Sequence, residues 1–209
     1  MSVAKRIEKK RFTYGDYLAW PDDERWEIID GEAYDMTPAP NRFHQKIAGN
    51  LFSIIHRFLE GKACEVYIAP FDVRLPDSDE VDEKVCTVVQ PDIVVVCDPK
   101  KLDERGCRGA PDWVIEILSP STSGKDHLKK RELYERHGVK EYWLIHPTDR
   151  VVMIYRLAKK TFGKPSVYED ESEIQVGIFP DLMVQTSKIF PSQPKLVKES
   201  PRKFSSQPK

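Results

Sequence analysis

Two acidic side chains in apolar segments are the residues of this chain best suited to chemistry. Asp92 precedes Ile93-Val94-Val95-Val96, and Glu116 lies within Trp113-Val114-Ile115-Glu116-Ile117-Leu118. A carboxylate buried among Val, Ile and Leu loses its hydration and is costly unless a cation or hydrogen bonds compensate it. Two carboxylates on neighbouring strands supply the oxygen ligands that Mg²⁺ prefers. The pair therefore predicts a divalent-cation site, against two alternatives: a strand-end cap for Asp92 and a structural ion pair for Glu116.

A lysine on the following predicted helix is the third candidate. At 100° per residue, a helix over about 126–137 places five residues on one face: Asp126, Lys130, Leu133, Tyr134 and His137. Lys130 lies near the middle of this face, whereas Lys129 points away from it. An inward lysine suggests carboxylates for it to meet, and the alternative is a side chain that reaches past the sheet edge to solvent. Two acids, Mg²⁺ (or Mn²⁺) and an amine suit phosphodiester hydrolysis, because the metal ion activates water and the amine orients it or stabilises the developing charge.

His44 and Glu27 are further candidates for the site. His44 falls within the apolar stripe of a predicted helix from Asn41 to about Leu59, where it either is a hydrogen-bonded core residue or lines the site. Glu27 lies in a predicted hairpin over 26–36, in which Asp30-Gly31 is a strong turn signal. We expect Glu27 at the surface, reaching the site only if the hairpin folds over it.

The remaining elements predict an α/β fold. After the first helix come three strand-like runs, a second helix and a fourth strand: 65–75, 87–97, 113–118, 126–137 and 141–146. This order indicates a mixed sheet flanked by helices, preceded by an N-terminal β-hairpin. The segments 151–157 and 174–184 are expected to extend the edge of that sheet.

Composition and length favour one domain. With 209 residues, 40% of them hydrophobic, the chain can form one medium core, which we place at 13–187 between a flexible basic arm (1–12) and a disordered polar tail (188–209). The 33 Lys and Arg nearly balance the 34 Asp and Glu, so any phosphate-binding patch must be local. Basic residues at 100–108 and 125–131 are candidates for DNA contact, with plain solvation as the alternative.

The sequence also predicts the cellular compartment, through signals that it lacks. No stretch approaches a membrane span, and Met-Ser-Val-Ala-Lys-Arg is not typical of a secretory signal, so we expect a cytoplasmic protein without a membrane partner. The four cysteines are too widely spaced for a zinc knuckle and are expected to be reduced thiols: Cys64, Cys86, Cys97 and Cys107.

The motifs around these residues resemble a known family. They are Gln90-Pro91-Asp92-Ile93-Val94-Val95, Glu116-Ile117-Leu118-Ser119-Pro120-Ser121-Thr122, Lys130-Arg131-Glu132-Leu133-Tyr134 and Gly138-Val139-Lys140-Glu141-Tyr142-Trp143. Together with Glu27-Ile28-Ile29-Asp30-Gly31-Glu32 and His44, they are similar to the Uma-type restriction endonucleases, a branch of the PD-(D/E)XK nuclease superfamily. The resemblance covers roughly residues 13 to 185.

This resemblance implies a restriction-endonuclease-like αβββαβ core. It also implies that Asp92 and Glu116 are metal ligands, with the backbone carbonyl of Ile117 completing the site. The superfamily pattern has its lysine two residues after the glutamate, where this chain has Leu118, and the resemblance assigns that role to Lys130 on the helix.

We therefore expect a Mg²⁺-dependent DNA endonuclease whose catalytic residues are Asp92, Glu116 and Lys130, with His44 and Glu27 as candidates for lining the site. One alternative is a DNA-binding protein that keeps the fold without useful turnover, and another is a hydrolase of RNA or of a small nucleotide. A symmetric homodimer would provide two active sites for cutting both strands of a duplex.

Overall fold

The computed structural model describes residues 10–21, 23–36, 39–119 and 124–191, apart from the side chains of 124–127. In chain order its elements are α1 (Tyr14–Tyr17), β1 (Trp26–Ile29), β2 (Glu32–Asp35), α2 (Arg42–Leu59), β3 (Glu65–Ile68), β4 (Val73–Arg74), η1 (Asp82–Lys84), β5 (Val88–Val89), β6 (Ile93–Val96), η2 (Pro99–Lys101), β7 (Leu102–Asp103), β8 (Gly106–Arg108), β9 (Trp113–Ile117), α3 (Gly124–His137), β10 (Glu141–His146), β11 (Val151–Ala158), β12 (Thr161–Phe162), β13 (Ser166–Tyr168), β14 (Glu173–Gln175), β15 (Met183–Gln185) and α4 (Thr186–Ile189).

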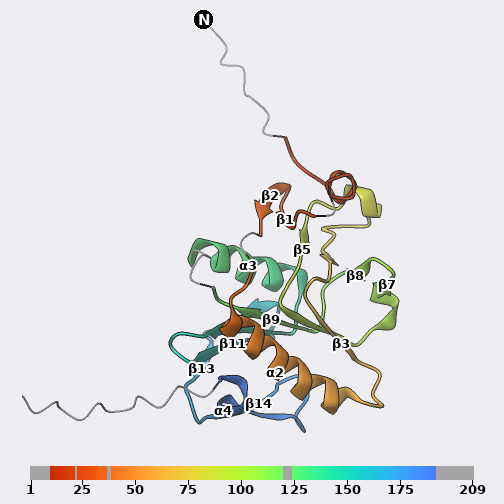
Figure 1. Cartoon of the computed structure of the whole chain (residues 1–209). Coiled ribbons are helices and arrows are strands. Elements are labelled where there is room, and N and C mark those ends of the chain that lie inside the picture. Colours follow the sequence, from red (N-terminus) through yellow and green to blue (C-terminus); the bar gives the residue numbers. More distant parts are fainter. Residues whose placement is uncertain (1–9, 22, 37–38, 120–123, 192–209) are drawn as a thin grey trace, which may run out of the picture.

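The main sheet is mixed and lies between two helices (Figure 1). Its strand order is β12-β11-β10-β9-β6-β3, with β13 also paired to β11. Strands β9 and β10 are parallel, and α3 connects them, whereas β3, β6 and β9 form an antiparallel series. The order α2, β3, β6, β9, α3, β10 agrees with the expected αβββαβ core.

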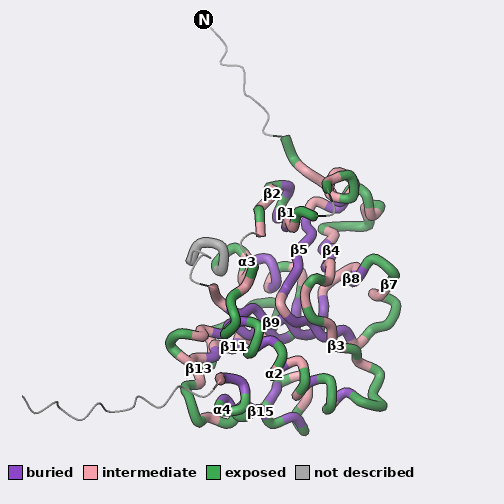
Figure 2. Tube along the Cα trace, in the orientation of Figure 1, coloured by how far each residue is buried: buried purple, intermediate pink, exposed green. Residues whose placement is uncertain are grey.

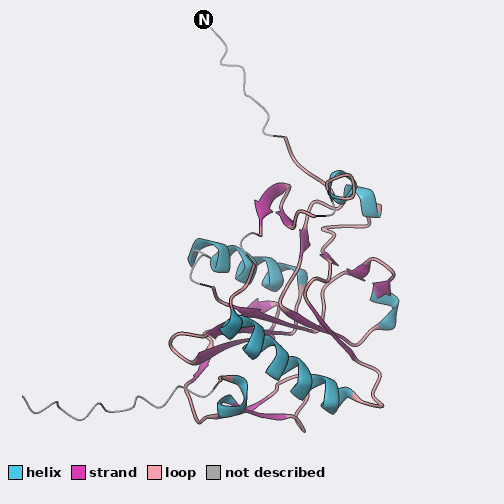
Figure 3. Cartoon of the chain, in the orientation of Figure 1, coloured by secondary structure: helices cyan, strands magenta, loops and turns pink. Residues whose placement is uncertain are grey.

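Each face of the main sheet has its own hydrophobic core, because alternate residues of a strand point to opposite faces. Helix α2 packs with α4 and β14–β15 against Ile93, Val95 and Ile115, whereas α3 packs against Val94 and Val114. Figure 3 shows α2 and α3 on opposite sides of the strands, and Figure 2 shows the buried segments concentrated between them. Val94 and Val114 are paired on the α3 side of the sheet. Glu116 lies two residues after Val114 in β9, so its side chain also points toward α3.

The N-terminal hairpin forms as the sequence predicts. Asp30 and Gly31 both have positive φ angles, 51° and 80°, as a tight two-residue β-turn requires. Strand β1 also pairs with β5, which places the hairpin in a second sheet of order β2-β1-β5-β4-β8-β7. The Phe12 amide donates to the carbonyl of Gly31 at 2.9 Å, which joins the chain before α1 to the same turn.

Three predicted strand segments differ from the prediction: two are split between sheets, and one lies in a separate sheet. The run 65–75 splits into β3 of the main sheet and β4 of the second sheet, and 87–97 splits into β5 and β6. Pro70 and Pro91 lie at the two breaks and have no N–H to continue a ladder. The segment 174–184 does not extend the main sheet edge; it forms the separate two-stranded sheet β14–β15.

The expectation of four reduced cysteines is wrong, because Cys64 and Cys97 form a disulfide. They flank β3 and β6, whose register pairs Glu65 with Val96, so the two cysteines are the next opposing pair, with Cα atoms 3.9 Å apart. Cys86 and Cys107 are free thiols. The cysteine spacing gave no indication of this pairing, because 33 residues separate the two partners in sequence.

The predicted arm and tail lie mostly outside the described residues. The boundaries after residues 12 and 187 stay predictions, although Ile189 and Phe190 are buried in the core on the α2 side of the sheet. Within the described parts of the chain, no helix combines the length and apolarity needed to cross a membrane.

Candidate active site

Asp92 and Glu116 are brought together by the antiparallel pairing of β6 with β9. The register places Ile93 opposite Ile115, so the next pair is Asp92 and Glu116. Directly opposed residues on antiparallel strands project from the same face with Cβ atoms roughly 4.5–5.5 Å apart. Their side chains retain 19% and 10% exposure, so both carboxylates are largely removed from water.

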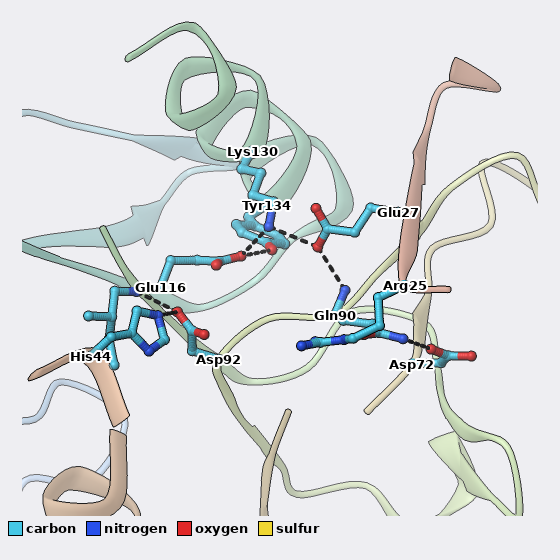
Figure 4. A network of polar contacts seen from close by, with 10 residues as sticks. Arg25, Glu27, His44, Asp72, Gln90, Asp92, Glu116, Lys130 and Tyr134 are labelled. Carbon is cyan, nitrogen blue, oxygen red and sulfur yellow. Dashed lines mark hydrogen bonds and ion pairs between the residues drawn. The ribbon is translucent and has the colours of Figure 1, made fainter. Parts of the chain in front are cut away.

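Asp92 is held from two directions. Its Oδ2 accepts a hydrogen bond of 2.7 Å from the Ile117 amide and lies 3.2 Å from Nε2 of His44 (Figure 4). His44 lies in the first turn of α2, which is fixed because the Asn41 side chain accepts from the amides of Phe43 and His44. The structure therefore places His44 at the site while it remains a buried residue of the α2 apolar face.

The electrostatics of His44 follow from these contacts. Burial acts to lower the pKa of His44, but hydrogen bonding to Asp92 and the charges of Asp92 and Glu116 outweigh it, so that the pKa is raised. The backbone of Ile117 also contributes in this direction. Nδ1 of His44 is buried and has no hydrogen-bond partner among the described atoms.

Lys130 bridges two buried glutamates. Its Nζ lies 2.8 Å from Oε1 of Glu27 and 2.9 Å from Oε1 of Glu116. Burial acts to lower the pKa of Lys130, but the charges of Glu116 and Glu27 dominate and raise it, so the amine is an ammonium. Lys129 points away from the site, as expected, and its amine is exposed and contacts Tyr34. The side chain of Asp126, expected on the same face as Lys130, lies outside the described residues.

The expectation that Glu27 is a surface residue is wrong. The hairpin folds over α3, and the Glu27 side chain is only 7% exposed. Arg136 of α3 donates to Asp30 at the hairpin turn at 2.6 Å, and the Lys129 amine donates to the Tyr34 hydroxyl of β2. These contacts attach the hairpin to α3 at the turn and at β2. This docking is a long-range contact that the hairpin sequence does not reveal.

Tyr134 is a site residue that the sequence reasoning did not select. Its hydroxyl donates to Oε1 of Glu116 at 2.7 Å, the same oxygen that Lys130 contacts. Burial raises the pKa of Tyr134 well above its usual value, and the charge of Glu116 adds to the effect, so the hydroxyl keeps its proton as a donor. The helical spacing of four residues between Lys130 and Tyr134 is the signal that could have identified it.

Glu116 is short of compensating charge despite these donors. Burial raises the pKa of Glu116 to about 7; Lys130 opposes this, whereas the charges of Asp92 and Glu27 add to it. Three carboxylates thus face one ammonium group and one histidine. Buried carboxylates in excess of their cations favour binding of a further positive charge.

The donor set suits a hard cation with few protein ligands. No described residue donates to the second oxygen of Asp92 or of Glu116, and Figure 4 shows the second oxygen of Glu116 on the side of Asp92. Across the described part of the chain, no three His, Cys, Asp or Glu side chains gather in a way that could hold a metal ion. The two carboxylates supply hard oxygen ligands of the kind that Mg²⁺ takes, one or two at a time, while it keeps several waters.

Comparisons with known proteins agree with this fold. The model of the Uma2 family, whose description reads "Putative restriction endonuclease", matches residues 14–187. A protein of Synechocystis sp., described as uncharacterized, is 27% identical over 143 residues, which are 67% of this chain and 71% of the relative. The crystal structure of a protein from Anabaena variabilis, described as a putative nuclease belonging to DUF820, superposes with a TM-score of 0.69 over 86% of this chain and 97% of that chain, at 24% identity. The expected restriction-endonuclease-like α/β fold is thereby confirmed.

Proposed function

The chain belongs to the Uma2 family of restriction-endonuclease-like proteins, and we propose that it is a metal-dependent endonuclease that hydrolyses phosphodiester bonds of DNA. The observation that carries the proposal is the convergence of Asp92 and Glu116 from paired strands with Lys130 from α3. Metal dependence and activity are proposed from the chemistry of these side chains.

Asp92 and Glu116 would hold Mg²⁺ or Mn²⁺ through the oxygens that no described residue contacts, with the Ile117 carbonyl as the further ligand implied by the family. The ion would polarise the phosphate and lower the pKa of water, which is the chemistry that phosphodiester hydrolysis requires. The Ile117 amide and His44 fix the other oxygen of Asp92, and Tyr134 and Lys130 fix that of Glu116. The protein therefore presents both acids in set orientations.

Lys130 has one donor left for the reaction. An ammonium group carries three N–H donors, of which Glu27 and Glu116 accept two. No third acceptor for this amine lies among the described residues, so the remaining N–H is available to a water molecule or to a phosphate oxygen. Glu27 keeps the Lys130 amine in this place, because Glu27 is itself held: the backbone N–H of Gln90 donates to Oε1 of Glu27 at 2.8 Å.

The reaction adds one water molecule across one bond. The water oxygen bonds to phosphorus, one bridging P–O bond breaks, and the departing oxygen takes up a proton, which leaves a phosphate monoester end and a hydroxyl end. Lys130 would stabilise the negative charge that develops on the phosphate oxygens. His44 stays a candidate for lining the site, because its described polar contact is to Asp92.

The test is metal-dependent cleavage of supercoiled, linear duplex, single-stranded and branched DNA. We expect cleavage with Mg²⁺ or Mn²⁺, none with a chelator, and loss of activity in Asp92→Ala and in Glu116→Ala, each still folded. Asp112→Asn is the matched control: Asp112 is also buried, but it precedes β9, at the opposite end of the strand from Glu116, and accepts from the Cys97 amide. Retained cleavage by either alanine variant would remove the assignment, and metal binding without any cleavage would favour a DNA-binding protein that has lost turnover.

A further inference from the structure

A second group of polar residues lies beside the acids and centres on Gln90. The Nε2 of Gln90 donates to Oδ1 of Asp72 at 2.9 Å and to the Tyr17 hydroxyl at 3.0 Å. Tyr17 in turn donates to the same oxygen of Asp72 at 3.1 Å. Both donors of the Gln90 amide group are therefore used, and its carbonyl oxygen must face the other way.

Arg25 lies where that carbonyl oxygen points. Its Nε and Nη2 lie 3.3 and 3.0 Å from Oε1 of Gln90. Figure 4 shows the Arg25 side chain running alongside Gln90 toward the part of the network that holds Asp92. Gln90 is a neutral acceptor that Asp72 and Tyr17 hold in place, and it therefore fixes the orientation of the Arg25 guanidinium.

The hairpin directs Arg25 and Glu27 to the same side. The Met36 amide donates to the Arg25 carbonyl at 2.9 Å, which continues the β1–β2 ladder one pair beyond Trp26 and Asp35. Residues 25 and 27 of an extended segment project from one face. Glu27 of this pair reaches Lys130, so Arg25 belongs to the same surface of the hairpin as a residue of the candidate active site.

The charge of Arg25 has no anionic partner in the described structure. No described carboxylate lies within ion-pair distance of its guanidinium, and Gln90 uses only part of its five N–H donors. Other basic residues near the second sheet serve the fold instead: Lys101 donates to the Ala110 carbonyl at 2.7 Å, and Arg108 donates to the Glu80 carbonyl at 2.6 Å. A guanidinium held in place with free donors is the group that proteins use to bind phosphate in a fork geometry.

We propose that Arg25 is a phosphate-binding residue that holds a backbone phosphate of DNA next to the bond to be cut. This inference rests on the proposed nuclease function and adds a substrate-binding position that lies outside the acid, acid and lysine set. Gln90 is the positioning residue, since it orients the guanidinium through one acceptor. Tyr17 and Asp72 act through Gln90.

The test is DNA binding without cleavage. The probe is a fluorescein-labelled DNA duplex of about 20 base pairs, titrated in EDTA and again with Ca²⁺, with anisotropy read across a series of NaCl concentrations. For Arg25→Gln we expect about tenfold weaker binding and a slope of log K against log salt that is smaller by about one, as loss of one phosphate contact predicts. For Arg25→Lys, which keeps the charge and loses the fork, we expect the wild-type slope and binding that is a few-fold weaker.

Arg57→Gln is the matched control, because it removes the same charge from an exposed residue of α2. It lies 13 residues after His44, about 20 Å along the helix, and should bind as the wild type does. Wild-type affinity and slope in both Arg25 variants would overturn the proposal, even if their melting temperatures fall, because Arg25 would then only support Gln90. If Arg25→Gln does not fold, Arg25→Lys carries the test, and wild-type affinity in that variant overturns the proposal. A wild-type chain that binds DNA through Arg25 but never cleaves it would refute the nuclease function, and only the phosphate contact of Arg25 would remain.

Discussion

Replacing Lys130 with methionine should destabilise the metal-free chain strongly. The ammonium group is shared by Glu27 and Glu116 at 2.8 and 2.9 Å, and the three side chains are 12%, 7% and 10% exposed. Removing one partner of a buried ion pair typically costs about 3–5 kcal/mol, because the charge that remains is uncompensated. At about 2–4 °C per kcal/mol for a chain of this size, the melting temperature should fall by about 6–20 °C.

The loss of stability in Lys130→Met should grow with pH, because Glu116 titrates differently in the folded and the unfolded chain. Burial raises the pKa of Glu116 to about 7 in the folded chain, above the value of about 4.3 for an unfolded glutamate. The folded state then binds this proton more tightly, so stability falls as the pH rises from about 4 to about 7. Without the amine the pKa of Glu116 rises further, which extends the decline above pH 7 and widens the gap between variant and wild type between about pH 7 and 9.

The assay is urea unfolding in EDTA at several pH values. Lys129→Met is the matched control, because its amine is at the surface, where an ion pair contributes at most about 1 kcal/mol. Lys130→Met combined with Glu27→Gln should recover part of the loss, since one of the two orphaned carboxylates becomes neutral. A cost below about 1 kcal/mol for Lys130→Met, or a cost that is the same at pH 5 and pH 9, would refute the shared-ammonium description.

Three further predictions concern single contacts. Tyr134→Phe removes the hydroxyl that donates to Glu116, so the free energy of unfolding should fall by about 1.5–3 kcal/mol and the Mn²⁺ affinity, measured by calorimetry, by at least about tenfold. Tyr142→Phe should change neither quantity, because the buried hydroxyl of Tyr142 has no hydrogen-bond partner in the described structure. Reduction of the Cys64–Cys97 disulfide should lower stability by about 2–4 kcal/mol, seen as a lower melting temperature with a dithiol reductant, and an unchanged free-thiol count on reduction would contradict the bond. Gly106→Ala should cost about 1–3 kcal/mol in thermal melting, because φ at Gly106 is +123° and a Cβ there would meet the Asp72 carbonyl; wild-type stability would rule out this close approach.

The sequence by itself determined the parts of the protein that depend on local pattern. The 3.6-residue period places Lys130 on the inward face of α3, and the Asp30-Gly31 turn sets the register of the hairpin. The apolar runs identify Glu116 as buried and Asp92 as largely removed from water. These inferences work because side-chain direction within one helix or strand follows from spacing alone. The same patterns predicted the order of the core helices and strands along the chain, although two of the strand runs divide between the two sheets.

Tertiary structure alone decided which distant side chains meet. Glu27 became buried because the hairpin docks on α3, Cys64 reached Cys97 because β3 pairs with β6, and Arg25 met Gln90 across 65 residues of chain. Periodicity gives the face on which a residue lies and carries no information about which other element covers that face. Strand pairing and the docking of the hairpin resolve that choice, because they depend on packing and charge across the whole domain.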